Sequence, residues 1–109
     1  MSEITRFNKK DPIVQGGDKS LDIQSATNFT TVSIPTGANY VVARALKADS
    51  TTNTAILRYT VDNSEPTSSS GFPIANMDIL VFESSFWNRL KFISTDAETQ
   101  QLWFMWYAT

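Results

Sequence analysis

Hydrophobic and polar residues alternate along most of this 109-residue chain. From Leu21 onward, apolar residues recur at every second position, and many are β-branched or aromatic, which is typical of β-strands. Turn-forming clusters separate these runs, and no segment longer than one turn has a helical period with a cap and a stop. The pattern predicts an all-β fold, an antiparallel β-sandwich or jelly roll of seven or eight strands. The predicted strand runs are 21–23, 29–34, 40–46, 56–61, 79–82, 90–93 and 102–107.

Residues 1–20, MSEITRFNKKDPIVQGGDKS, do not follow this pattern. Their apolar residues are isolated and fit neither a strand nor a helical period, so we predict an extended N-terminal arm over 1–20 and a single β-sandwich domain over 21–109. A disordered terminus is the alternative. The basic residues and lone apolar anchors of the arm are candidates for docking onto a neighbouring molecule. They are Arg6, Phe7, Lys9, Lys10 and Ile13.

The composition excludes several kinds of functional site. The chain has no cysteine and no histidine, which excludes disulfides, thiolate or imidazole metal sites and the Ser-His-Asp and Cys-His nucleophile systems. A net charge of −2 provides no basic excess for nucleic acid or an anionic membrane. The apolar runs are too short to span a bilayer, and the polar start does not resemble a signal peptide. We therefore predict a protein that is not an enzyme, needs no cofactor and is used without secretion.

The carboxylates lie singly at predicted strand ends and turns. We interpret them as turn-forming residues or solvated charges. A glycosidase pair would need two of them facing each other across a cleft, which the sequence leaves open. The segment 62–65 offers several oxygen ligands for calcium, but it lacks the alternating acidic pattern and the bidentate glutamate of an EF-hand loop. We predict no metal site.

Two aromatic segments indicate contact surfaces. The C-terminal run LWFMWY is apolar on both faces, so either the row with Trp106 or the row with Trp103 stays exposed unless something covers it. A second subunit would give a homodimer or trimer, and another part of the chain is the alternative. In ESSFWN, the adjacent residues Phe86 and Trp87 cannot both point into one core. At least one should be exposed or covered by a neighbouring chain.

One stretch resembles a known family. RYTVDNSEPTSSSGFPI, followed by ILVFES and NRLKFIS, is similar to a module of small virion proteins of tailed bacteriophages, which often carry R-Y-T-x-D-G-x-x-P-T-x-x-x-G-x-P. The likeness covers roughly residues 40–107. Asn63 stands where the pattern usually has glycine, and asparagine also tolerates left-handed geometry. A similar turn occurs in β-sandwich domains appended to carbohydrate-active enzymes, so the turn alone does not identify a function. We interpret the motif as a structural β-turn connection, and a contact loop is the alternative.

The resemblance implies a capsid decoration (cement) protein. Such a protein binds the outer capsid surface and stabilises contacts between subunits of the major capsid protein, after synthesis in the host cytoplasm. It needs no catalytic residues, and many copies on a symmetric shell make weak contacts effective together. One alternative is a carbohydrate-binding module that stacks sugars on Phe72, Phe86 or Trp87. Another is a head-completion or tail-adaptor protein with the same sandwich.

Overall fold

The structure, a computed structural model, describes residues 11–47, 55–96 and 98–109. It contains eight β-strands and two short 3-10 helices, which confirms the predicted all-β fold. The strands are β1 (Ser20–Ile23), β2 (Thr27–Asn28), β3 (Tyr40–Leu46), β4 (Ala55–Thr60), β5 (Phe72–Ala75), β6 (Ile79–Glu83), β7 (Lys91–Ser94) and β8 (Gln100–Tyr107). The helices are η2 (Phe29–Thr31), between β2 and β3, and η3 (Ser84–Arg89), between β6 and β7.

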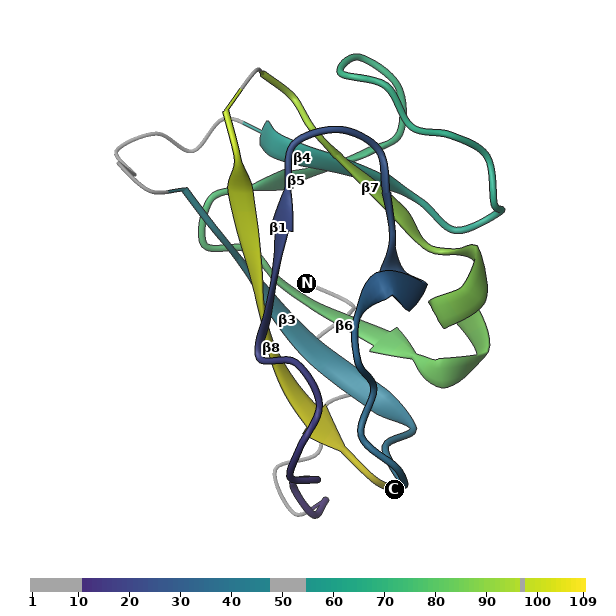
Figure 1. The fold of residues 1–109 in the computed structure, drawn as a ribbon. Coiled ribbons are helices and arrows are strands. Elements are labelled where there is room, and N and C mark those ends of the chain that lie inside the picture. Colours follow the sequence, from purple (N-terminus) through teal and green to yellow (C-terminus); the bar gives the residue numbers. More distant parts are fainter. Residues whose placement is uncertain (1–10, 48–54, 97) are drawn as a thin grey trace.

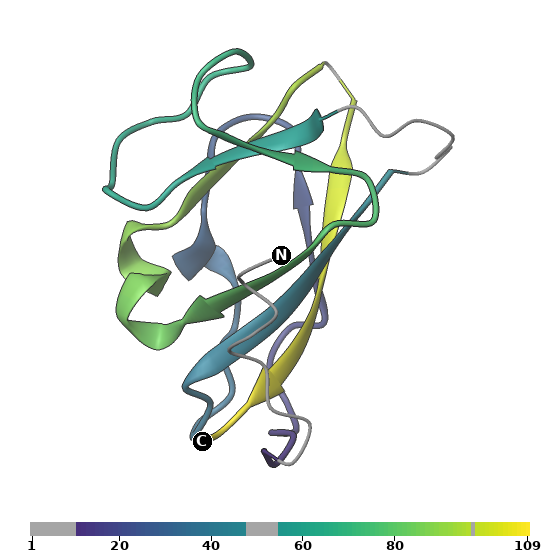
Figure 2. The same cartoon turned by 180° about the vertical axis from the view of Figure 1, so that it is seen from behind.

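The strands form two antiparallel sheets that face each other (Figures 1 and 2). The first sheet has the order β1-β8-β3-β6, and the second has the order β2-β7-β4-β5. The first strand thus pairs with the last, the second with the seventh, the third with the sixth and the fourth with the fifth. This nested pairing is the arrangement of a jelly roll, in which a long hairpin is rolled into two sheets.

Aromatic rings fill the space between the sheets. Phe29 is fully buried, and its ring centroid lies 5.6 Å from that of Phe104 and 6.3 Å from that of Phe92, so it contacts a strand of each sheet. The inward row of β8 is Leu102, Phe104 and Trp106, opposite Val41, Ala43 and Ala45 of β3. Tilted and edge-to-face ring pairs of this kind add to the stabilisation from apolar burial.

The segment 29–34 is not the strand that its alternation predicted. Only Thr27 and Asn28 pair with β7, and the chain then turns through η2, where the Val32 amide donates to the Phe29 carbonyl over 3.0 Å. The turn lets Phe29 enter the core between the sheets. Its own amide donates to the carbonyl of Leu90 over 2.9 Å, so its burial leaves no unpaired donor.

The structure also contains a strand that the sequence did not predict. β5 has Pro73 in its middle, a residue that cannot donate to a β-ladder. It is tolerated because β5 is the edge strand of the second sheet and pairs only with β4.

Residues 11–19 do not support the predicted arm, because they continue the edge of the first sheet. The amide of Val14 donates to the Trp106 carbonyl, and the amide of Phe104 donates to the Lys19 carbonyl, each over 2.8 Å. β8 is twice as long as β1, and this segment provides partners for the rest of its edge. The glycines and charged residues of this segment interrupt the apolar alternation, so the sequence does not predict that it pairs with β8. Residues 1–10, and with them Arg6, Phe7, Lys9 and Lys10, lie outside the described part of the chain.

Candidate interaction surfaces

The outer face of the first sheet exposes large apolar side chains. Because Leu102, Phe104 and Trp106 point inward, the alternate row of β8 points outward, and Trp103 and Met105 are 43% and 49% exposed. Ile13 is also exposed beside β8. Val42 of β3 pairs with Met105, and Val81 of β6 pairs with Val42, so the apolar surface continues across three strands.

The exposed apolar surface of this face does not extend to Tyr107. Tyr107 belongs to the outward row but is buried, and its ring stacks on that of Tyr40 with centroids 5.2 Å apart. The Tyr40 hydroxyl donates to the Asp11 carboxylate over 2.8 Å. The exposed apolar surface therefore lies toward the end of the sheet that carries Trp103.

Two hollows flank Trp103 and Met105. One is apolar, has a volume of about 380 Å³ and lies toward β3 and β6, where Val42, Arg44 and Ile79 line it. The other has a volume of about 320 Å³ and lies toward residues 13–19. Trp103 and Met105 line both hollows, so they form a ridge between them, which we call the Trp103 ridge.

Hydrogen bonds fix the orientation of the exposed indole. The Trp103 Nε1 donates to Gln101 Oε1 over 3.1 Å, and the Gln101 Nε2 donates to Asp22 Oδ1 over 3.0 Å. The three side chains lie on the same face of neighbouring strands, since Asp22 of β1 pairs with Gln101 of β8. An aromatic ring held in this way loses little conformational entropy when a partner covers it.

Two of the candidate contact residues belong to the core. Trp106 is only 3% exposed, and its Nε1 donates to the Asp18 carbonyl over 2.8 Å. Trp87 is 7% exposed, and its Nε1 donates to the Phe82 carbonyl over 3.1 Å. Each ring is therefore the buried member of its candidate pair, because the inward row of β8 and the η3 turn place Trp106 and Trp87 between the sheets. Phe86, the neighbour of Trp87, is 38% exposed. This agrees with the expectation that two adjacent large aromatic residues cannot both point into one core.

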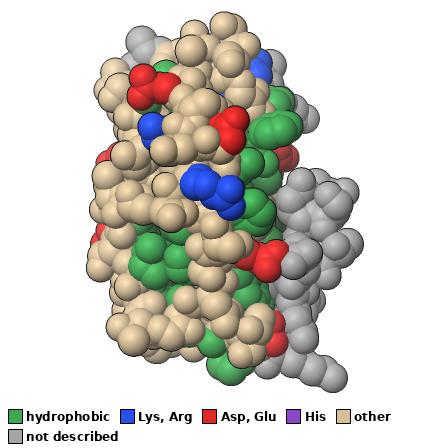
Figure 3. Space-filling view, turned by 90° about the vertical axis from the view of Figure 1, so that its right-hand side faces the viewer, with side chains coloured by type: hydrophobic (Ala, Val, Ile, Leu, Met, Phe, Trp, Pro, Cys, Tyr) green, Lys and Arg blue, Asp and Glu red, His purple; other side chains and the backbone are tan. Residues whose placement is uncertain are grey.

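Phe86 and Phe72 are exposed away from the hollows beside Trp103. Phe86 lies on η3, and the Arg89 guanidinium is 5.4 Å from the centre of its ring. Phe72 of β5 packs partly on Tyr59, with ring centroids 5.5 Å apart, and lines a separate hollow of about 350 Å³. Figure 3 shows the side of the molecule on which β7 and η3 lie, where acidic and basic side chains are scattered among polar and hydrophobic ones.

The motif that carries the sequence resemblance holds a loop in place. Arg58 of β4 donates to the carbonyls of Ser68 and Gly71, over 3.3 Å and 2.9 Å, and so binds the loop onto the outer face of the second sheet. The amide of Ser64 donates to the Asp62 carboxylate over 3.0 Å, and Asn63 has a φ of 68°. The left-handed geometry expected of Asn63 is therefore confirmed. Ser64 also holds the pKa of the Asp62 carboxyl below its usual value.

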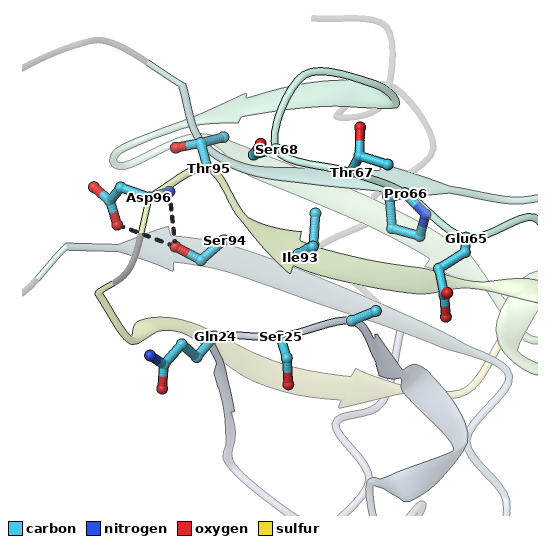
Figure 4. Close-up of a pocket in the computed structure, with 11 residues that line it drawn as sticks. Gln24, Ser25, Glu65, Pro66, Thr67, Ser68, Ile93, Ser94, Thr95 and Asp96 are labelled. Carbon is cyan, nitrogen blue, oxygen red and sulfur yellow. Dashed lines mark hydrogen bonds between the residues drawn. The ribbon is translucent and has the colours of Figure 1, made fainter.

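An open groove of about 870 Å³ lies between this loop, the turn at 24–26 and β7. Figure 4 shows its two carboxylates, Glu65 and Asp96, at opposite ends, so they do not face each other as a glycosidase pair would. The backbone amide of Glu98 holds the pKa of Asp96 below its usual value, and the Ser94 hydroxyl contributes in the same direction. Among the described residues, no group of three or more acidic side chains is placed to hold a metal ion.

Comparisons with known proteins do not identify the chain. It matches no protein-family model, and no similar protein was found among the curated proteins or the solved structures. In the described part of the chain, no helix is both long and apolar enough to cross a membrane.

Proposed function

We propose that this protein is a capsid decoration (cement) protein of a tailed bacteriophage. It would bind the outer surface of the capsid and stabilise contacts between subunits of the major capsid protein. The observation that carries the proposal is the exposure of large apolar side chains at separate places on one sandwich: Trp103 and Met105 on the first sheet, and Phe72 and Phe86 elsewhere. A protein that joins neighbouring molecules needs more than one adhesive surface.

The chemistry of these surfaces supports the proposal. Aromatic residues and methionine are enriched in the cores of protein interfaces, and truncation of such a residue often costs about 2 kcal/mol of binding free energy or more. The resemblance of residues 40–107 to small virion proteins gives the phage context. Many identical contacts on a shell add together, so each of them can be weak.

Protein quantification in purified virions of the encoding phage tests the proposal. A decoration protein should be present at on the order of hundreds of copies per particle, whereas about a dozen copies or fewer would indicate an adaptor or a tail part. Phe86→Ala should lower the temperature at which decorated capsids open. Thr30→Ala, an exposed polar position on η2, is the control and should leave that temperature unchanged.

A carbohydrate-binding module remains the second candidate, because the exposed indole of Trp103 could stack on a sugar ring. The buried Trp87, which the sequence suggested for this role, is not available for stacking. A glycan array that shows specific binding, lost in Trp103→Ala, would favour this function over the first.

A further inference from the structure

We infer that the outer face of the first sheet is a self-association surface, on which two copies of this chain pair about a two-fold axis. The inference does not depend on the phage assignment, because it follows from the shape and charge of this face alone. Three observations carry it: the ridge between two hollows, an arginine in an apolar hollow that forms no ion pair with another described residue, and a carboxylate exposed on the same face.

The surface formed by the Trp103 ridge and its two hollows has a shape that can fit against a second copy of itself. The Trp103 ridge has a hollow on each side, one of about 380 Å³ and one of about 320 Å³. In a two-fold dimer the same surface meets itself, so each copy must offer both a projection and a recess. A rotated second copy can place its Trp103 ridge in the apolar hollow beside Val42 and Ile79, and it receives the first ridge in return.

The charges are complementary in the same arrangement. Arg44 pairs with Trp103 in the β3–β8 ladder and lines the apolar hollow, and among the described residues it has no ion pair. Burying a guanidinium without a partner carries a large desolvation cost. Asp22 is exposed on β1 of the same face, with a hydrogen bond from Gln101. In the dimer, Arg44 of each copy would meet Asp22 of the other, so two ion pairs form.

The polar groups around Trp103 favour a protein partner over a sugar. A glycan site needs free donors and acceptors beside the aromatic ring to bind hydroxyl groups. Here the Trp103 Nε1, the Gln101 amide and one Asp22 oxygen already bind one another, and the adjoining hollow is lined mainly by apolar side chains. An apolar projection, such as the ridge of a second copy, matches this lining.

The dimer should be weak. Neighbouring strands lie about 4.8 Å apart, so the four-stranded face is only about 19 Å wide. At one end of this face, Tyr107 is buried against Tyr40 and adds little exposed apolar surface. The eight residues of β8, at about 3.4 Å each, give the face a length of about 27 Å and a flat area of about 500 Å², which is smaller than the roughly 800 Å² per partner of a standard interface. We expect a dissociation constant of about 10–100 µM.

Sedimentation velocity of the purified full chain, from about 1 to about 200 µM, tests the inference. Wild-type protein should shift from monomer to dimer across this range. Trp103→Ala and Met105→Ser should each raise the dissociation constant at least about tenfold, because they remove the ridge. Phe86→Ala removes an exposed aromatic ring outside the two hollows and should leave the dissociation constant unchanged. Far-UV circular dichroism shows that each variant is folded.

A charge exchange tests the proposed pairing. Arg44→Asp and Asp22→Arg should each weaken the dimer by at least about fivefold, because each leaves like charges opposed. The double variant should recover most of the affinity, which a merely structural role of either residue would not produce. Failure of the double variant to recover would overturn the Arg44–Asp22 pairing.

Two results would overturn the inference as a whole. One is a wild-type protein that stays monomeric up to about 200 µM, and the other is a dimer whose affinity does not change in Trp103→Ala. Specific glycan binding by a monomeric wild type, lost in Trp103→Ala, would assign the face to a sugar instead. Because no capsid is involved, these results are independent of the virion copy number that tests the proposed function.

Discussion

The indole rings of Trp87 and Trp106 meet edge to face, with centroids 5.5 Å apart and planes at 90°. Trp87 comes from η3, which connects the two sheets, and Trp106 comes from the inward row of β8. Both indole nitrogens donate to backbone carbonyls, those of Phe82 and Asp18. The pair therefore joins three segments that are distant in sequence, and it supports the fold rather than an external contact.

Truncation of either ring should strongly destabilise the protein. Trp87→Ala and Trp106→Ala should each lower the free energy of unfolding by about 3–5 kcal/mol, because a large cavity remains in the core. Urea denaturation measures the change. Phe86→Ala, at the exposed neighbour of Trp87, should cost less than about 1 kcal/mol. Equal losses at positions 86 and 87 would contradict the burial of Trp87.

The attachment of residues 11–19 to the sandwich can be tested at two glycines with positive φ. A Cβ on Gly17 would lie 2.4 Å from the Pro35 Cδ and 2.8 Å from the Ser33 carbonyl oxygen, whereas a Cβ on Gly37 would have no atom within 4 Å. Both Ala variants force a left-handed alanine, which costs roughly 1–2 kcal/mol. Gly17→Ala should lose at least about 1 kcal/mol more, because of the clash. Equal losses in thermal unfolding would indicate that this segment is not packed on the sandwich.

The strand pattern was predictable because alternation follows directly from burial of one face. It located β1, β3, β4, β6, β7 and β8, and it required one row of the LWFMWY segment to be exposed unless something covers it. It could not tell which row, because both rows are apolar and only the pairing of β8 between β1 and β3 decides the direction. For the same reason, Trp103 could not be separated from Trp106 as the exposed ring.

Other features depend on contacts that are distant in sequence. The alternation at 29–34 indicated a strand, but the core between the sheets takes Phe29 through a 3-10 turn instead. The two hollows that flank Trp103 combine residues from β3, β6, β8 and the segment 13–19. No local pattern indicates such a surface. The register of β8 was needed to choose Trp103 over Trp106 as the exposed ring.

Arg58 should determine the order of the loop after β4. Arg58→Ala removes the bonds to the Ser68 and Gly71 carbonyls and should cost about 1–3 kcal/mol in unfolding free energy, with faster amide exchange in the loop at 61–71. Lys91→Ala is the control, since Lys91 pairs with Thr60 on the same face of the neighbouring strand β7. Unchanged exchange in the Arg58 variant would show that the loop holds its conformation without the guanidinium.

The Asp96 carboxylate should make stability depend on pH in the acid range. It accepts hydrogen bonds from the Glu98 amide over 2.9 Å and from the Ser94 hydroxyl over 3.2 Å, and these lower its pKa from the ordinary value of 3.8. A carboxyl whose pKa is lower in the folded state stabilises the protein above its unfolded-state pKa, and this contribution is lost as pH falls through the folded-state pKa. Wild type should therefore melt at a higher temperature than Asp96→Asn near neutral pH, and the two melting temperatures should converge as the pH falls through the lowered folded-state pKa of Asp96. The difference should be small, because the carboxylate is exposed to solvent. Ser94→Ala, which removes one of the donors, should reduce the pH-dependent part of the difference without abolishing it. A melting-temperature difference between wild type and Asp96→Asn that is constant from neutral to acid pH would show that the turn does not depend on the charge of Asp96.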